Sequence, residues 1–96
     1  MKKTALDALL AKYEANGGWL AEANVKYGGY LFQYSGSHFG YVWRMTEKYE
    51  WGDPDTEHEY GWNSFEDFLN DTMTEVGMTF REVLAALPAE AVYGLE

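Results

Sequence analysis

The apolar residues of this chain change their spacing at Gly17-Gly18, from the period of a helix to that of a strand. The segment before the two glycines predicts a helix over residues 4–16, because glycine readily takes the left-handed conformation that ends a helix. Thr4, with Asp7 three residues later, gives this helix an imperfect capping box. One buried helix face is expected from apolar residues spaced three and four apart: Leu6, Leu9, Leu10 and Tyr13.

Between residues 19 and 62, apolar and polar residues alternate in the two-residue period of half-buried strands. Gly28-Gly29 predicts a hairpin turn, because primed turns need positive φ angles. Ser35-Gly36-Ser37 and residues 52–56 (GDPDT) predict two further turns. The expected strands lie at 19–27, 30–34 and 39–51, with a short edge strand within 57–62. In the longest of them, one face carries Phe39, Tyr41, Trp43, Met45, Tyr49 and Trp51.

Two more helices are predicted after the strands. Asn63 begins a helix near 64–76 with a capping box, and Gly77 ends it. Its buried stripe is Phe65, Phe68, Leu69, Met73 and Val76. Thr79 begins a third helix near 80–87 with another capping box. The fold class is therefore α+β: an N-terminal helix, an antiparallel three- to four-stranded meander, and two C-terminal helices packed on one sheet face.

The length of the chain, 96 residues, fits one compact domain spanning 1–96, since folded domains commonly have about 100–150 residues. Leu95 and Glu96 could be the remnant of a purification tag and are left out of the functional argument. The lack of cysteine excludes disulfide scaffolds and cysteine catalysis. No signal peptide or membrane-spanning apolar run is visible, so we expect a cytoplasmic protein.

Charge is distributed unevenly between the two halves of the chain. Residues 1–46 hold three acids against five Lys and Arg, whereas residues 47–96 hold thirteen acids against Lys48 and Arg81. Such asymmetry favours a partner of opposite charge. Nucleic acid and anionic membrane are disfavoured as direct ligands, because proteins bind both largely through Lys and Arg.

The acidic stretch at residues 47–62 invites a test for metal binding. Four acids take the odd positions of a calcium-binding loop: Asp53, Asp55, Glu57 and Glu59. However, His58 stands where that loop needs a glycine, and Ser64 where it needs a glutamate. Zinc or iron would need several nitrogen or sulfur ligands, and the chain has two histidines and no cysteine. We therefore expect no metal and no cofactor.

Catalysis is disfavoured by the same kind of reasoning. Ser37 and His38 are adjacent, but neighbours on a strand point to opposite faces. No nucleophile elbow, phosphate-binding loop or dinucleotide fingerprint is present in the sequence. We expect a protein that is not an enzyme, with a minimal carboxylate enzyme or metal-binding protein as a remaining alternative.

A second acidic row is expected on the predicted helix near 64–76, where Asp67, Asp71 and Glu75 stand four residues apart without a lysine to relieve them. Two short helices cover only one sheet face well, so some tyrosines and tryptophans should remain exposed. Exposed residues of these types are favoured in the cores of interfaces. The residues predicted to bind a partner are Glu47, Tyr49, Glu50, Trp51, Asp53, Asp55, Glu57, Glu59, Tyr60, Asp67, Asp71 and Glu75.

In its size, acidity, aromatic content and lack of cysteine, the chain resembles the small proteins that phages use against bacterial defence, including anti-CRISPR and DNA-mimic anti-restriction proteins. The resemblance covers size and charge pattern only. It implies a stoichiometric inhibitor, monomeric or dimeric and in the host cytosol if phage-encoded, that occupies a basic surface on a nucleic-acid-binding protein or complex. The alternative is a small structural protein that assembles with itself through an exposed aromatic sheet face.

Overall fold

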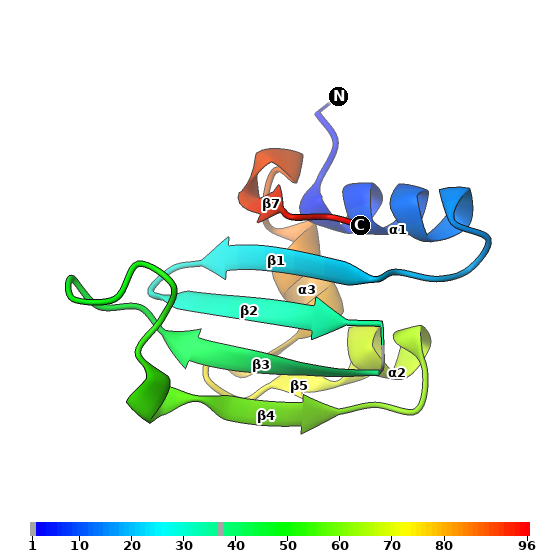
Figure 1. Cartoon of the computed structure of the whole chain (residues 1–96). Coiled ribbons are helices and arrows are strands. Elements are labelled where there is room, and N and C mark those ends of the chain that lie inside the picture. Colours follow the sequence, from blue (N-terminus) through cyan, green and yellow to red (C-terminus); the bar gives the residue numbers. More distant parts are fainter. Residues whose placement is uncertain (1, 37) are drawn as a thin grey trace.

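The computed structural model describes residues 2–36 and 38–96, and Figure 1 shows how they are arranged. In chain order the elements are α1 (Ala5–Ala15), β1 (Glu22–Tyr27), β2 (Tyr30–Ser35), β3 (Phe39–Arg44), η1 (Pro54–Thr56), β4 (His58–Gly61), α2 (Phe65–Asn70), β5 (Thr72–Met73), β6 (Met78–Thr79), α3 (Phe80–Ala85), η2 (Ala89–Ala91) and β7 (Val92–Tyr93). The predicted α+β class, with helices and an antiparallel sheet, is confirmed.

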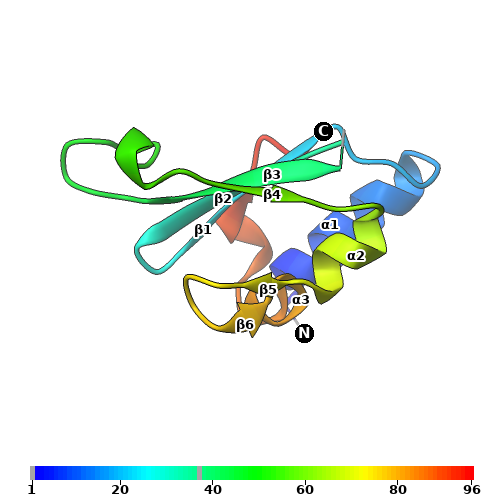
Figure 2. The same cartoon turned by 90° about the horizontal axis from the view of Figure 1, so that it is seen from below.

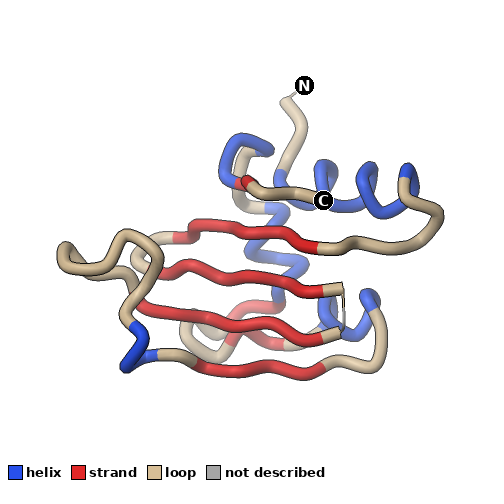
Figure 3. Tube along the Cα trace, in the orientation of Figure 1, coloured by secondary structure: helices blue, strands red, loops and turns tan. Residues whose placement is uncertain are grey.

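The main sheet has five antiparallel strands in the order β4-β3-β2-β1-β7, and β5 pairs with β6 in a separate ribbon. Figure 2 shows α1, α2 and α3 together on one side of this sheet, and Figure 3 distinguishes helices from strands by colour. β7 is a strand that the sequence did not predict, because it is only two residues long. In the two described ranges, no helix is long and apolar enough to cross a membrane.

Side-chain caps fix where the helices begin. In α1, Thr4 Oγ1 accepts a hydrogen bond from the Asp7 N–H at 3.1 Å, and Asp7 Oδ2 accepts one from the Thr4 N–H at 3.0 Å. α3 begins with the same reciprocal arrangement at Thr79. α2 begins one residue later than predicted, because Ser64 and not Asn63 is its N-cap. These caps supply acceptors to N–H groups that have no partner within the helix.

The prediction of one strand over 39–51 is wrong beyond Arg44. The chain leaves the sheet there and returns at Asp53, whose N–H donates to the Arg44 carbonyl oxygen at 2.7 Å. Residues 45–52 therefore form a loop that is closed at its base, and a turn at residues 46–49 reverses its direction. The aromatic residues of this loop keep the two-residue spacing of a strand, although the loop is not a strand of the sheet. Periodicity alone therefore could not show that the chain leaves the sheet after Arg44.

The predicted helix near 64–76 is also wrong in length, since α2 ends at Asn70. β5 and β6 follow as a small hairpin, in which Thr72 pairs with Thr79. Gly77, which was predicted to end the helix, lies instead in the hairpin connection with a φ of 74°. Threonine is β-branched and suits a strand better than a helix, and this local preference prevails over the apolar helical spacing.

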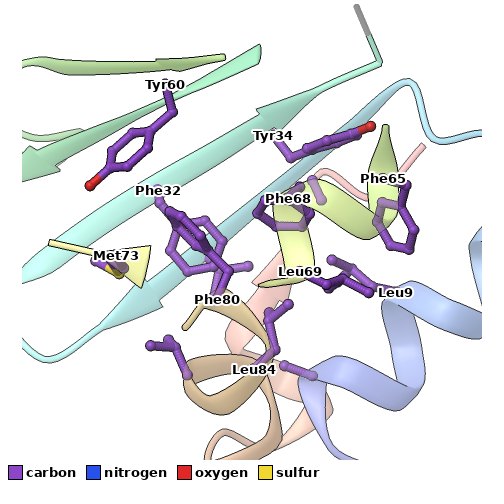
Figure 4. Close-up of a cluster of buried hydrophobic side chains, with 14 of the residues drawn as sticks. Leu9, Phe32, Tyr34, Tyr60, Phe65, Phe68, Leu69, Met73, Phe80 and Leu84 are labelled. Carbon is purple, nitrogen blue, oxygen red and sulfur yellow. The ribbon is translucent and has the colours of Figure 1, made fainter. Parts of the chain in front are cut away.

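Phe80 lies at the centre of the core between the sheet and the helices (Figure 4). Its ring centroid is 5.0 Å from that of Phe68, 5.2 Å from Phe32, 5.3 Å from Tyr60 and 5.5 Å from Trp62. Such aromatic pairs contribute about 0.5–1.5 kcal/mol each beyond the area that they bury. The rings come from both the sheet side and the helix side, so this one cluster holds the two layers together.

The face of α1 that enters the core differs slightly from the predicted one. Ala5 and Leu9 are fully buried, whereas Leu10 is 37% exposed. The Ala5 N–H donates to the Leu87 carbonyl oxygen at 2.8 Å, which ties the start of α1 to the segment just after α3. The helix is therefore turned so that its Ala5 side faces its neighbours.

The C-terminal residues extend the sheet edge beyond β1. The Glu96 N–H donates to the Glu22 carbonyl oxygen at 2.9 Å, and the Glu96 carbonyl oxygen accepts from the Ala21 N–H at 2.6 Å. Leu95, which the sequence analysis set aside with Glu96, packs against the core. Met1, and Ser37 of the predicted turn after β2, lie outside the described residues.

Gly40 on β3 gives the Trp62 ring the space that it occupies. A Cβ at Gly40 would overlap the Gln33 carbonyl oxygen and would lie 3.1 Å from the Trp62 ring. We expect Gly40→Ala to lower the free energy of unfolding by about 1–3 kcal/mol, the usual range for overpacking a core. Denaturant unfolding followed by circular dichroism measures the change.

Gly61→Ala on the neighbouring strand is the matched control, because a Cβ at Gly61 meets nothing within 4 Å. This variant should change the free energy of unfolding by no more than about 0.5 kcal/mol. Equal stabilities of the Gly40 and Gly61 variants would contradict the packing described for Trp62.

Candidate protein-interaction surface

One face of the five-stranded sheet has none of α1, α2 and α3 over it, and this is the face turned toward the viewer in Figure 1. The buried side chain of Val42 on β3 lies in the core on the opposite, helix-covered face. Because side chains alternate along a strand, Phe39, Tyr41 and Trp43 point away from the helices. An antiparallel sheet covered on one side usually presents polar residues on the other, so these aromatic residues are unexpected for a purely structural surface.

The three rings form a continuous row along β3, which we call the aromatic row (Phe39, Tyr41 and Trp43). The Phe39 and Tyr41 centroids are 5.8 Å apart in an edge-to-face arrangement. The Tyr41 and Trp43 rings are stacked, with centroids 5.5 Å apart and planes 24° from parallel. All three side chains remain partly exposed. The prediction that these three residues share one face of a strand is confirmed.

Two carboxylates of the adjacent region lie beside this row. Glu59 on β4 is the direct cross-strand partner of Tyr41, so both side chains are on the uncovered face. Glu57 Oε1 accepts a hydrogen bond from Trp43 Nε1 at 3.0 Å. Both glutamates are exposed, and within the described part of the chain neither forms an ion pair. Two of the rings therefore have a carboxylate beside them whose charge is not neutralised.

Two aspartates precede these glutamates at η1. Asp53 Oδ1 accepts a hydrogen bond from the Asp55 N–H at 2.9 Å, which makes Asp53 the N-cap of this short helix. Asp55 is exposed, and its carboxylate has no hydrogen-bond partner among the described residues. Asp53 thus has a structural role as well as a charge, whereas Asp55 contributes charge alone.

The loop of residues 45–52 supplies the remaining predicted residues. Trp51 is 62% exposed, and its ring centroid is 5.4 Å from that of Tyr93 on β7. Glu47 and Glu50 are exposed, and Tyr49 is half-buried. Between the loop and β1 is an open hollow of about 420 Å³ lined by Lys26, Met45, Thr46, Tyr49, Glu50 and Trp51.

The predicted acidic row of Asp67, Asp71 and Glu75 does not exist as one helix face, because α2 ends at Asn70. Asp67 is exposed on α2. Asp71 Oδ2 instead accepts a hydrogen bond from Trp62 Nε1 at 2.9 Å. This bond holds the connection after β4 against the end of α2, so Asp71 serves the fold.

Tyr60, which was predicted to meet a partner, is only 7% exposed. Its hydroxyl donates to Glu75 Oε1 at 2.6 Å and accepts from the Thr74 N–H at 3.1 Å. Glu75 Oε2 also accepts from His58 Nδ1 at 2.7 Å. Glu75 therefore links two residues of the edge strand β4 to the connection between β5 and β6, and neither Tyr60 nor Glu75 is free for a partner.

This contact changes the acidity of both groups. Burial acts to raise the pKa of Glu75, but the hydrogen bonds from Tyr60 and His58 outweigh burial and hold that pKa below its ordinary value of 4.5. Burial, with the hydrogen bond to Glu75, raises the pKa of Tyr60 to about 12. Glu75 is therefore a carboxylate and Tyr60 a neutral phenol at neutral pH.

No group of three or more potential ligands that could hold a metal ion is found within residues 2–36 and 38–96. His38 is exposed in the turn between β2 and β3, whereas His58 is engaged with Glu75. The calcium-loop acids include Asp53, which caps η1, and Glu57, which bonds to Trp43. The acids of this stretch therefore cap the turn at η1 or lie on the exposed surface beside β3.

The importance of the aromatic row for this surface is not evident from the sequence. The periodicity places the aromatic residues on one face of a strand, but it does not show that this face lies away from the helices. The position of Glu59 beside Tyr41 comes from the register of β3 against β4. This register was not predicted, because the strand that begins at Phe39 was expected to continue to residue 51 and ends at Arg44. Comparison with known proteins finds no matching family model, no matching curated protein and no matching solved structure.

Replacing Glu75 by Gln should lower the free energy of unfolding by about 1–2 kcal/mol at pH 7, because hydrogen bonds to a charged acceptor are lost. The folded-state pKa of Glu75 lies below the ordinary value of 4.5, so its stabilising contribution is complete above that value and disappears as the pH falls through the folded-state pKa. Denaturant unfolding of both proteins at pH 7 and at about pH 3 measures this, and the difference should shrink at the lower pH.

Glu59→Gln is the control, since Glu59 is exposed on the same strand and has no hydrogen-bond partner among the described residues. It should alter the free energy of unfolding by less than about 0.5 kcal/mol. If the Glu75→Gln deficit is the same at both pH values, the charge of Glu75 does not contribute as described.

Proposed function

We propose that this chain is a non-enzymatic binding protein that uses the uncovered face of its sheet to occupy a basic, nucleic-acid-binding surface on another protein. The observation that carries this proposal is the aromatic row on β3, flanked on the same face by the carboxylates of Glu57 and Glu59, which form no ion pair among the described residues. Apolar rings give a partner a surface to desolvate, and the carboxylates define the sign of charge that the partner must carry.

The acidic half of the chain supports a role in steering a basic partner. Residues 47–59 contribute six acids against Lys48 in a single region at one end of β3 and along β4. Clustered charge of one sign accelerates association with a surface of the opposite sign, and salt weakens that effect. Because Asp71 and Glu75 are engaged inside the fold, we assign the steering to the exposed acids of this region.

The aromatic residues support a role in holding the complex together. Tyrosine and tryptophan are enriched among the residues that contribute most to binding. Phe39, Tyr41 and Trp43 lie on the face, and Trp51 adds a strongly exposed ring on the neighbouring loop. Phe39, Tyr41 and Trp43 lie on a paired strand, so little order has to be created there upon binding.

The class of partner follows from charge and from the resemblance to phage inhibitors. A surface that carries closely spaced carboxylates can compete with nucleic acid for the same Lys and Arg side chains. An inhibitor of this kind would act in stoichiometric amounts and, if phage-encoded, in the cytosol of a bacterial host. Self-association through the same face is the alternative, but it would bring the free carboxylates of two copies near one another, which is unfavourable.

Charge reversal on the proposed surface tests this function. The double variant Asp55→Lys/Glu59→Lys changes two exposed side chains without hydrogen-bond partners among the described residues, so the fold should be retained. Immobilised wild-type protein should capture a nucleic-acid-binding protein from a bacterial lysate and release it when DNA or RNA is added. With that partner purified, the association rate of the double variant should be lower by about tenfold or more at low salt.

The matched control is Glu14→Lys/Glu90→Lys, which changes net charge equally at exposed positions on α1 and η2. This control should retain most of the wild-type association rate. Equal capture by the two double variants, or a captured protein that binds nucleic acid and this chain at the same time, would contradict the proposed function. Sedimentation that shows only self-association would favour the alternative.

A further inference from the structure

We infer that the uncovered face recognises arginine in preference to lysine, in an extended segment of the partner. This inference rests on the proposed function and specifies the chemistry of the partner. It concerns the part of the face formed by Tyr41, Trp43, Glu57 and Glu59, which we call the ring–carboxylate site.

The two rings of this site are stacked on each other and partly exposed. Tyr41 and Trp43 occupy alternate positions of β3, and their planes differ by only 24°. Trp43 is also held by the hydrogen bond from its Nε1 to Glu57 Oε1 at 3.0 Å. A Cβ at Gly52 would overlap Trp43 Cβ, so the end of the 45–52 loop is closely packed on Trp43 and restricts its movement. The site is therefore ordered before a partner arrives.

The carboxylates of the site retain capacity to bind a cation. Glu57 uses one oxygen for the Trp43 indole, which leaves the second oxygen without a hydrogen-bond partner in the described residues. Glu59 stands directly across from Tyr41 and has no side-chain partner in the same ranges. Arg44 cannot neutralise them from the same face, because it pairs with Tyr30 at a position whose side chains point to the other side of the sheet.

Rings beside carboxylates favour a guanidinium group over an ammonium group. Guanidinium is planar, stacks on aromatic rings, and presents several N–H donors that match a carboxylate. An ammonium group is compact and strongly hydrated, so bringing it against a ring removes more water for fewer directed contacts. At the ring–carboxylate site, an arginine could stack on Trp43 or Tyr41 while it donates to Glu57 or Glu59.

The spacing of the site indicates the shape of the partner segment. Tyr41 and Trp43 are two residues apart on β3, as are Glu57 and Glu59 beside them, and this separation is about 6–7 Å along an extended chain. The same separation divides alternate side chains of any extended peptide. In an extended segment with arginines at alternate positions, all the arginine side chains would point to the same side, toward the site. Arginines at adjacent positions would point to opposite sides, so only one of each pair could reach the site.

Two short peptides of equal charge test this inference. One carries arginine at alternate positions with serine between, and the other carries lysine at the same positions. We expect the arginine peptide to bind about fivefold or more tightly than the lysine peptide, as measured by fluorescence anisotropy at about 50 and 150 mM salt. Trp43→Leu should reduce this preference to less than about twofold, because the stacking surface is lost.

Trp19→Leu is the matched control, because Trp19 is 53% exposed beside Gly36 at the opposite end of β2 from the partner of Trp43. It should leave the preference unchanged. Circular dichroism checks that each variant is folded. If Trp43→Leu is unfolded, Glu59→Gln replaces it as the test variant. Glu59→Gln should then weaken binding of the arginine peptide more than the control Glu14→Gln does.

The possible results separate this inference from the proposed function. Equal, salt-dependent binding of the two peptides would overturn arginine recognition and leave a charge-based surface intact. An arginine preference that survives both Trp43→Leu and Glu59→Gln would also overturn it, since the preference would then arise elsewhere. Failure of both peptides to bind would overturn it too, whereas the lysate capture and its charge-reversal variants decide the proposed function.

Discussion

The short length of the helices determines how the rest of the molecule is arranged. α1 has 11 residues and α2 and α3 have 6 each, so α2 and α3 are each only about 9 Å long at about 1.5 Å per residue. Strands lie about 4.8 Å apart in a sheet, so neither α2 nor α3 spans five strands alone, and α1, α2 and α3 lie together on one face. The large core side chains are accordingly concentrated on that face, around Phe80. The other face is left for Phe39, Tyr41 and Trp43.

Local signals in the sequence were sufficient for the fold class and for most helix and strand starts. The capping boxes at Thr4 and Thr79 and the Gly28-Gly29 hairpin act over a few residues, and each is found where the sequence predicts it. The end of α2 at Asn70 could not be found in this way. The apolar helical spacing continues past Asn70, and neither the pairing of Thr72 with Thr79 nor the hydrogen bond from Trp62 to Asp71 can be read from it.

The candidate surface was predictable in its charge but not in its composition. Exposed acids at Asp55, Glu57 and Glu59 follow from a polar turn and an edge strand, and the structure leaves them exposed. Periodicity assigns residues to two faces of a strand but cannot decide which face the helices cover. Tyr60 was therefore expected outside and is buried, while Tyr41 lies on the uncovered face.

The same kinds of residue thus serve two separate purposes in this chain. On the helix side, an acid next to an aromatic residue stabilises the fold, as with Glu75 and Tyr60. On the uncovered side, Glu57 and Trp43 form a similar pair whose carboxylate is exposed. Net charge alone cannot separate these two purposes, because both contribute to the value of −9. The acids that can bind a partner are those with exposed carboxylate oxygens that accept no hydrogen bond from the described residues.

Contact between a basic partner and the uncovered sheet face can be measured directly, because the chain has four tryptophans. Each indole N–H gives its own signal in a proton–nitrogen correlation spectrum, so a titration with the captured partner reports on four sites at once. We predict that the Trp43 signal shifts or broadens, while Trp62, bonded to Asp71 on the helix side, and Trp19 keep theirs. Changes at Trp19 or Trp62 with an unchanged Trp43 signal would contradict the account and move the interface to another part of the molecule.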